Sequence, residues 1–163
     1  MKVNKTNIFN EVKDNYRTQN ILDERVLKAF SIIDRSDFVP EGFRDFSYSD
    51  IEIPLSDKQT MLRPSVEGMI AQSLNLKKTD NVLVVGTGTG YLTSCISLLC
   101  NKVDGIDILQ NMVDLGQNNI QKYNLSNVKI ENKDIFQNWN IIGNYNVVLF
   151  TFGLDNYEIV CTH

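Results

Sequence analysis

The chain has 163 residues, of which 42% are hydrophobic and 22% are charged, and its formal net charge is −4 at pH 7. These values are typical of one globular domain with a sizeable core, and the acidic excess argues against general binding of nucleic acid or of anionic membranes. No apolar run approaches the roughly 20 residues of a membrane-spanning helix, and the three cysteines and one histidine match no metal-binding spacing. The odd cysteine count and the lack of a signal-peptide core predict a cytoplasmic protein.

The first part of the chain predicts three helices around an irregular segment. Residues 8–16 carry a weak apolar stripe, and Asp23 can cap a second helix that ends near Pro40. The apolar face of that second helix consists of Val26, Leu27, Phe30 and Ile33. Residues 41–62 predict an irregular segment packed on the domain, and Pro64 opens a helix to about residue 74. The apolar stripe of this third helix consists of Val66, Met69, Ile70 and Leu74.

Residues 81–91, NVLVVGTGTGY, predict a buried strand, a glycine turn and the start of a helix. Gly86, Gly88 and Gly90 tolerate positive φ and let a ligand approach the backbone, and the helix start offers free N–H groups. A dinucleotide-binding fingerprint needs G-x-G-x-x-G, but its third glycine falls on Tyr91, which disfavours a nicotinamide oxidoreductase. A turn that serves only strand–helix packing is the alternative.

The rest of the chain alternates strands with helices. Strands are predicted at residues 82–85, 103–106, 128–131 and 145–152, and helices at 91–99 and 112–123. This alternation predicts a doubly wound, mainly parallel sheet with right-handed crossovers and the strand order 3-2-1-4. Ligands of such sheets bind at the carboxyl ends of the strands, beside the point where the strand order reverses.

Two acidic residues follow successive strands at that edge. Asp107 ends the second strand, where its carboxylate can accept hydrogen bonds from both hydroxyls of a ribose; the alternative is a solvated surface aspartate. Asp134 follows the third strand, where the amino group of an adenine can donate to it, although aspartate also favours loops for its own local hydrogen bonds. Ile108 and Ile135 beside them can sandwich the adenine ring.

Five stretches of the chain resemble the protein-L-isoaspartate O-methyltransferases, a family of class I S-adenosylmethionine-dependent methyltransferases. They are VLKAFSIIDRSDFVP (26–40), YSDIEIPLSDKQTMLRP (48–64), VLVVGTGTGYLTSCIS (82–97), VDGIDI (103–108) and YNVVLFTFG (145–153). The resemblance implies a Rossmann-like α/β sheet with an N-terminal helical cap, and methyl transfer to the α-carboxylate of L-isoaspartyl residues in damaged proteins. It also implies one domain over residues 1–163, with the cap and acceptor loop in 1–64 and the cofactor-binding core in 65–163.

The resemblance assigns the cofactor S-adenosylmethionine to two groups of residues. The first group is the glycine turn, which would wrap the methionine part of the cofactor. The second group follows the strands and would hold the ribose and the adenine. The predicted cofactor-binding residues are Gly86, Thr87, Gly88, Gly90, Tyr91, Asp107, Ile108, Asp134 and Ile135.

The acceptor loop departs from the family pattern. Leu62 stands where the family has a catalytic serine, Lys58 where it has a glycine, and Val84 where it has an acid near the methionine end of the cofactor. Thr60 can replace the missing hydroxyl, and Arg63 can pair with the acceptor carboxylate unless it is a solvated surface charge. The predicted catalytic set is therefore Thr60, Leu62 and Arg63. The alternative is a non-catalytic relative that binds the cofactor or acts through a protein interface.

The chain ends soon after its fourth predicted strand, whereas relatives continue through three more strands. Only 11 residues follow Phe152, too few for a crossover and another parallel strand. Residues 145–152 are therefore expected to form an apolar edge without charged protection. Such an edge predicts a homodimer, unless the strand-like tail at residues 157–161 folds back onto it.

Overall fold

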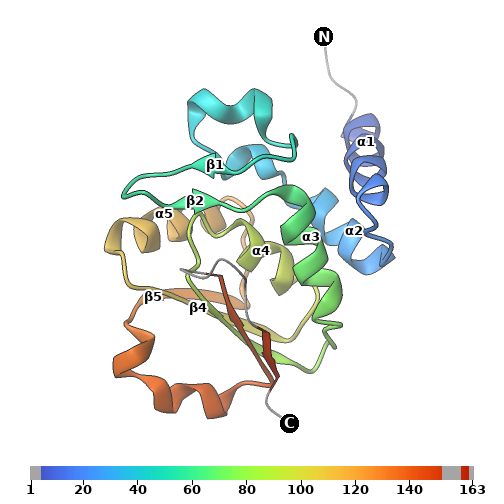
Figure 1. The fold of residues 1–163 in the computed structure, drawn as a ribbon. Helices are drawn as coiled ribbons and strands as arrows, with labels where there is room; N and C mark the ends of the chain where they lie inside the picture. The colour runs from blue at the N-terminus through green and yellow to red at the C-terminus, as the bar shows by residue number, and fades with distance from the viewer. Residues whose placement is uncertain (1–4, 152–158, 162–163) are drawn as a thin grey trace. The chain divides into compact units, whose positions relative to one another are not determined.

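The computed structural model describes residues 5–151 and 159–161, which divide into two compact units, Met1–Asn75 and Leu76–His163 (Figure 1). The boundary follows the third helix, so it lies later than the division expected between residues 64 and 65. The single domain over residues 1–163 stays a prediction. Among the helices of the described ranges, none combines the length and apolarity that crossing a bilayer requires.

The first unit begins with the two predicted helices, although the second ends at Ile32 and not near Pro40. They are α1 (Lys5–Thr18) and α2 (Glu24–Ile32). The carboxylate of Asp23 caps α2 by accepting a hydrogen bond of 2.8 Å from the backbone N–H of Arg25. The predicted apolar face of the second helix is buried throughout, at Val26, Leu27, Phe30 and Ile33.

The third helix, α3 (Pro64–Ser73), starts at the predicted proline and buries Ile70 and Leu74 of the predicted apolar stripe, but not all of it. Met69 is 39% exposed, whereas Glu67 and Gly68 are buried. The reason is a close approach at Gly68, where an added Cβ would lie 2.8 Å from Cγ1 of Ile21. The small residue thus lets the side of the helix that carries Gly68 pack closely, next to the buried Ile70 of the predicted stripe.

Residues 41–62 are more regular than the sequence predicts. They contain a 3₁₀ helix, η2 (Glu41–Phe46), and a hairpin of two antiparallel strands, β1 (Ile53–Pro54) and β2 (Thr60–Met61). A turn with Asp57 and Lys58 at positive φ joins the two strands. Strands of two residues are too short to show the period-2 alternation that reveals a strand in a sequence.

The second unit contains a five-stranded sheet in the order β5-β4-β3-β6-β7. Its strands are β3 (Asn81–Val85), β4 (Lys102–Asp107), β5 (Val128–Asn132), β6 (Val147–Phe150) and β7 (Ile159–Cys161). The first four are parallel, which confirms the predicted order 3-2-1-4. The strand order reverses between β3 and β6, so the carboxyl end of β3 faces a switch point.

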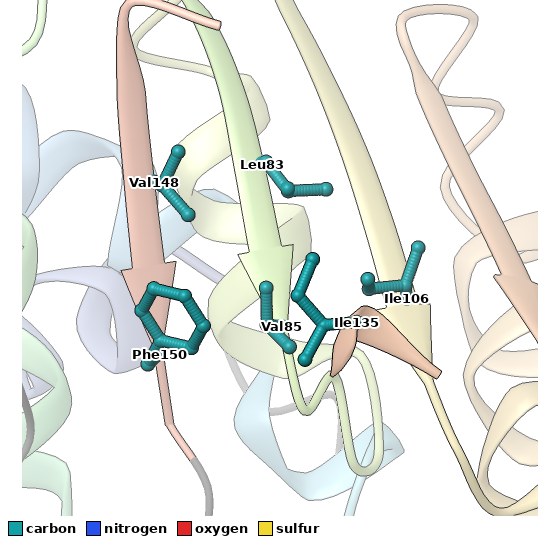
Figure 2. Packing of buried hydrophobic residues seen from close by; sticks show 6 residues of the cluster. All are labelled: Leu83, Val85, Ile106, Ile135, Val148 and Phe150. Carbon is teal, nitrogen blue, oxygen red and sulfur yellow. The ribbon is translucent and has the colours of Figure 1, made fainter. Parts of the chain in front are cut away.

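Both faces of the sheet are covered, as expected for a doubly wound fold. On one face, α5 (Gln110–Gln121) packs its Val113 and Ile120 against Ile130 of β5, and α4 (Tyr91–Ser97) contacts β4. On the other face, Ile135 of η3 (Ile135–Gln137) packs over the sheet (Figure 2). The side chains beneath it are Leu83, Val85, Ile106, Val148 and Phe150.

The predicted open edge at the fourth strand is wrong. β7 pairs with β6 in antiparallel register, with Val147 opposite Cys161 and Leu149 opposite Ile159. An antiparallel neighbour does not require the long crossover that a parallel strand needs, so the tail covers β6 within its own chain. The expected homodimer through this edge therefore has no support. Residue 152, the last of the predicted strand, lies outside the described residues.

Candidate cofactor site and acceptor loop

The glycine turn forms directly after β3, where the sequence places it. Gly86, Gly88 and Gly90 all have positive φ, at 88°, 50° and 84°. The backbone N–H of Gly86 donates to the carbonyl of Ile106 at 2.8 Å, and that of Gly90 donates to the carbonyl of Thr87 at 2.9 Å. The first bond ties the start of the turn to β4, and the second closes the turn before α4 begins at Tyr91, which is buried.

Gly88 and Gly90 serve different purposes in this turn. A Cβ at Gly90 would lie 3.2 Å from the Cα of Gly116, so this glycine permits α5 to pack closely. A Cβ at Gly88 would have no described heavy atom within 4 Å. The packing alternative therefore explains Gly90, whereas Gly88 leaves space beside the backbone that a ligand can fill.

Asp107, at the carboxyl end of β4, is only 8% exposed and is not a solvated surface aspartate. Its Oδ2 accepts a hydrogen bond of 3.1 Å from the N–H of Gly88, and its Oδ1 accepts one of 3.1 Å from the N–H of Leu109. A carboxylate can accept about four hydrogen bonds. Asp107 thus fixes the turn and retains capacity for the hydroxyls of a ribose.

Thr87 carries a buried polar atom inside the same turn. Its Oγ1 has no hydrogen-bond partner among the described residues. Its Cγ2 lies over Gly105, where an added Cβ would be 2.4 Å away. Buried hydroxyls are normally hydrogen-bonded, so this one is an unsatisfied polar atom inside the turn, as is Oγ1 of Thr93 in α4.

Asp134 forms the local hydrogen bonds that its sequence position allows. It caps η3, where its Oδ1 accepts a hydrogen bond of 2.9 Å from the N–H of Phe136, and its Oδ2 accepts one of 3.0 Å from Nε2 of Gln137. Ile108 is 64% exposed and can contact a ligand, whereas Ile135 is 3% exposed and belongs to the core on the face of the sheet that η3 covers. The adenine-binding roles of these residues stay predictions.

The residues of the acceptor loop lie in the first unit. Thr60 is exposed on β2 opposite Pro54, and Leu62 is half-buried between β2 and α3. Arg63 is exposed, and its Nε lies 4.0 Å from Oε1 of Glu52. Because an exposed ion pair of this length is weak, the guanidinium can exchange Glu52 for another carboxylate.

The sequence analysis missed a buried ion pair behind this loop. Nε of Arg35 donates to Oε2 of Glu67 at 3.0 Å, and both side chains are almost completely buried. Burial raises the pKa of the Glu67 carboxyl to about 7, and the charge of Arg35 opposes that rise. Glu67 precedes the buried Ile70 and Ala71 by one helical turn, a position that places its side chain on their face.

A groove of about 1000 Å³ runs along α5 and β5, apart from the predicted sites. Its walls are mainly polar, with the amide side chains of Gln110, Gln117, Gln121, Asn124 and Asn132. It contains none of the predicted cofactor-binding residues. We assign no ligand to it.

Comparisons with known proteins agree on one family. The family model described as Protein-L-isoaspartate(D-aspartate) O-methyltransferase (PCMT) matches residues 4–157. The protein-L-isoaspartate O-methyltransferase of Jannaschia sp. (strain CCS1) is 35% identical over 118 residues, which cover 72% of this chain and 53% of that protein. That of Paracoccus denitrificans (strain Pd 1222) is 41% identical over 97 residues, which cover 60% and 45%. The chain spans about half the length of the curated relatives it matches.

A solved structure has the same fold. A crystal structure of a protein-L-isoaspartate O-methyltransferase from Plasmodium falciparum, in complex with S-adenosyl-L-homocysteine, superposes with a TM-score of 0.75 at 19% identity. The match covers 91% of this chain and 86% of that one. The fold is therefore the Rossmann-like class I methyltransferase fold that the family resemblance implies, and its strand order is the one predicted from the sequence.

Proposed function

The chain belongs to the protein-L-isoaspartate(D-aspartate) O-methyltransferase family, and we propose that it methylates the free carboxylate of L-isoaspartyl residues in damaged proteins. The methyl donor is S-adenosylmethionine, whose sulfonium supplies an activated methyl group. The protein acts in the cytoplasm, where its odd number of cysteines fits a reducing environment.

The observation that carries this proposal is the bond between Asp107 and Gly88 at the open side of the glycine turn. The carboxylate and the turn are fixed to each other, beside a backbone with room for a ligand. Asp107 would hold the ribose, the turn would hold the methionine part, and Asp134 would accept from the adenine amino group.

The acceptor chemistry requires little from the protein beyond positioning. A carboxylate is already ionised at neutral pH, so no general base is needed to make it a nucleophile. What the reaction needs is an acceptor carboxylate held in line with the methyl group and protected from water. Arg63 would bind the acceptor carboxylate, Thr60 would offer a hydroxyl, and Leu62 would contribute only its backbone and apolar surface.

The alternative is a relative that binds the cofactor without catalysis, which the aliphatic Leu62 first suggests. The family match over residues 4–157 does not favour it. The two functions differ in one measurable way, because only the enzyme transfers a methyl group.

The test uses two peptides of the same sequence, one with an L-isoaspartyl residue and one with a normal aspartyl residue. Transfer of radiolabelled methyl groups is measured, and binding of S-adenosylhomocysteine is measured separately by calorimetry. We expect binding together with transfer to the isoaspartyl peptide alone. Binding without transfer would establish the non-catalytic alternative, and failure of both would refute the proposal.

A further inference from the structure

Arg35 joins three segments of the first unit from a position at the start of η1 (Arg35–Asp37). Its side chain is fully buried. Nε donates to Glu67 of α3, one terminal nitrogen donates to the carbonyl of Ser47, and the other donates to the carbonyl of Leu62 at 2.5 Å. A planar guanidinium with five donors in a fixed geometry can hold three acceptors at once, which a lysine ammonium cannot do with the same directions.

Two of these contacts act on the acceptor loop itself. The first holds the carbonyl of Leu62, the residue at the position of the expected catalytic serine. The second holds Glu67, whose backbone N–H donates to the carbonyl of Arg63 at 3.0 Å. The guanidinium therefore holds the peptide group before Arg63 directly and acts on the one after Arg63 through Glu67 and the first turn of α3.

We propose that Arg35 and Glu67 are a positioning pair that sets the backbone of the acceptor loop at Leu62 and Arg63, and thereby the place of the methyl acceptor. This inference rests on the proposed function for its catalytic consequence. Neither side chain touches the acceptor, because both are buried. They act through the carbonyl of Leu62 and the start of α3.

The burial of the pair supports a role in positioning. Removing two charges from water costs about as much as their attraction returns, so a buried ion pair is a poor source of stability and is better explained by the geometry it fixes. The raised pKa of Glu67, about 7, reflects this cost of burial. Deprotonation strengthens its bond to Arg35, because hydrogen bonds between charged groups are stronger.

Arg35 is the charged group that changes the pKa of the Glu67 carboxyl, in opposition to burial. On the flanking segments the other charged side chains are exposed or half-buried: Asp34, Asp37, Asp50, Glu52 and Arg63. On α1 and α2, which also pack on α3, charged side chains pair among themselves at the surface: Lys13, Asp14, Arg17 and Glu24. A pH effect on the loop would therefore originate at Glu67.

The experiment compares Arg35→Lys, Glu67→Gln and Glu67→Leu with the wild-type chain. Gln keeps an oxygen that can accept from Arg35 but cannot ionise, whereas Leu keeps the volume and removes the acceptor. Arg17→Lys is the matched control, because Arg17 forms an exposed ion pair with Glu24 in the same unit. Binding of S-adenosylhomocysteine, a property of the second unit, confirms that each variant is folded there.

Hydrogen exchange of residues 59–67 is the readout that does not depend on activity. We expect exchange there to rise about tenfold in Arg35→Lys and Glu67→Leu, with α1 and α2 unchanged, since local opening can be confined to one segment. Glu67→Gln should retain most of the protection, and Arg17→Lys all of it. Unchanged exchange in Glu67→Leu, or equal loosening of α1 and α2, would overturn the inference.

Methyl transfer to the isoaspartyl peptide supplies the second readout. We expect kcat/KM for the peptide to fall about tenfold in Arg35→Lys and Glu67→Leu, with cofactor affinity unchanged, because misplaced reacting groups lose rate steeply. The wild-type profile should show a step near pH 7 that Glu67→Gln lacks. A wild-type chain without transfer would refute the proposed function, while the exchange result would still decide whether the pair positions the loop.

Discussion

Asp107 and Gly88 are bound to each other at the carboxyl ends of β4 and β3, beside the switch point of the sheet, with the carboxylate Oδ2 3.1 Å from the backbone nitrogen. Asp107 lies at the end of β4, and Gly88 lies in the turn after the neighbouring strand β3. The same carboxylate also accepts from the N–H of Leu109, next to the start of α5. One buried side chain therefore orders both loops that surround the predicted cofactor site.

Replacing Asp107 with Asn should damage both stability and ligand binding. The Asn amide keeps one oxygen acceptor, but its NH₂ group replaces the second oxygen and faces a backbone N–H that then lacks an acceptor. This loss costs about 1–3 kcal/mol of unfolding free energy. S-adenosylhomocysteine should then raise the melting temperature much less than in the wild-type chain. Asp114→Asn, on the exposed side of α5, is the control and should change neither quantity. A full ligand-induced rise in Asp107→Asn would contradict the assigned role.

Alanine substitutions should separate the two roles of the glycine turn. Gly90→Ala meets the backbone of Gly116 and a positive φ, so it should cost about 1–3 kcal/mol of stability. Gly88→Ala meets only the positive φ and should cost about 1 kcal/mol, yet its methyl group should block the ligand. Gly143→Ala, in η4 (Trp139–Asn144) with open space around it, is the control for both. Thermal melts with and without S-adenosylhomocysteine distinguish these outcomes. Strong ligand binding by Gly88→Ala would show that the ligand does not bind in the open space beside Gly88.

The parts of the fold that repeat a pattern were predictable from the sequence. β3 and β6 follow from continuous apolar runs, β4 and β5 follow from short apolar segments that alternate with helical ones, and the strand order follows from the right-handed crossover. The position of Asp107 at the carboxyl edge of the sheet was predictable because this residue ends a predicted strand. The antiparallel β7 was not predictable in its register, because three residues carry too little pattern to choose between folding back and joining a second chain.

The buried pair in the first unit shows what a sequence pattern hides. Arg35 and Glu67 are 32 positions apart, and charged residues are expected at the surface. Only the tertiary structure shows that the guanidinium, in place of water, donates hydrogen bonds to the carbonyls of Ser47 and Leu62. A single charged residue on the buried face of a helix, such as Glu67 beside Gly68, is nevertheless a signal to search for a partner.

Restoring a hydroxyl in the acceptor loop should increase methyl transfer. Leu62→Ser supplies the positioning group that the family pattern has at this place, and we expect a rate increase of about tenfold, equivalent to roughly 1.4 kcal/mol. Leu62→Ala is the matched control, since it shortens the side chain equally and adds no hydroxyl. The measurement is the initial rate on the isoaspartyl peptide at saturating cofactor. An equal gain in both variants would attribute the effect to space rather than to hydrogen bonding.

The titration of Glu67 should make the stability of the chain fall as the pH rises through neutrality. Its folded pKa, about 7, lies above the ordinary value of 4.5, so the folded state binds this proton more tightly than the unfolded state does. The resulting stabilisation is complete below pH 4.5 and is lost as the pH rises towards 7. At about 1.4 kcal/mol per pH unit the loss can reach about 3 kcal/mol.

We expect the unfolding free energy of wild type minus that of Glu67→Gln to decrease by up to this amount between about pH 5 and about pH 8, measured by urea denaturation. Glu24→Gln is the control, because the hydrogen bond from Arg17 lowers the pKa of Glu24, so its difference from wild type should stay constant over this pH range. A difference between wild type and Glu67→Gln that stays constant or increases with pH would show that Glu67 is ionised throughout this range, with Arg35 outweighing the cost of burial.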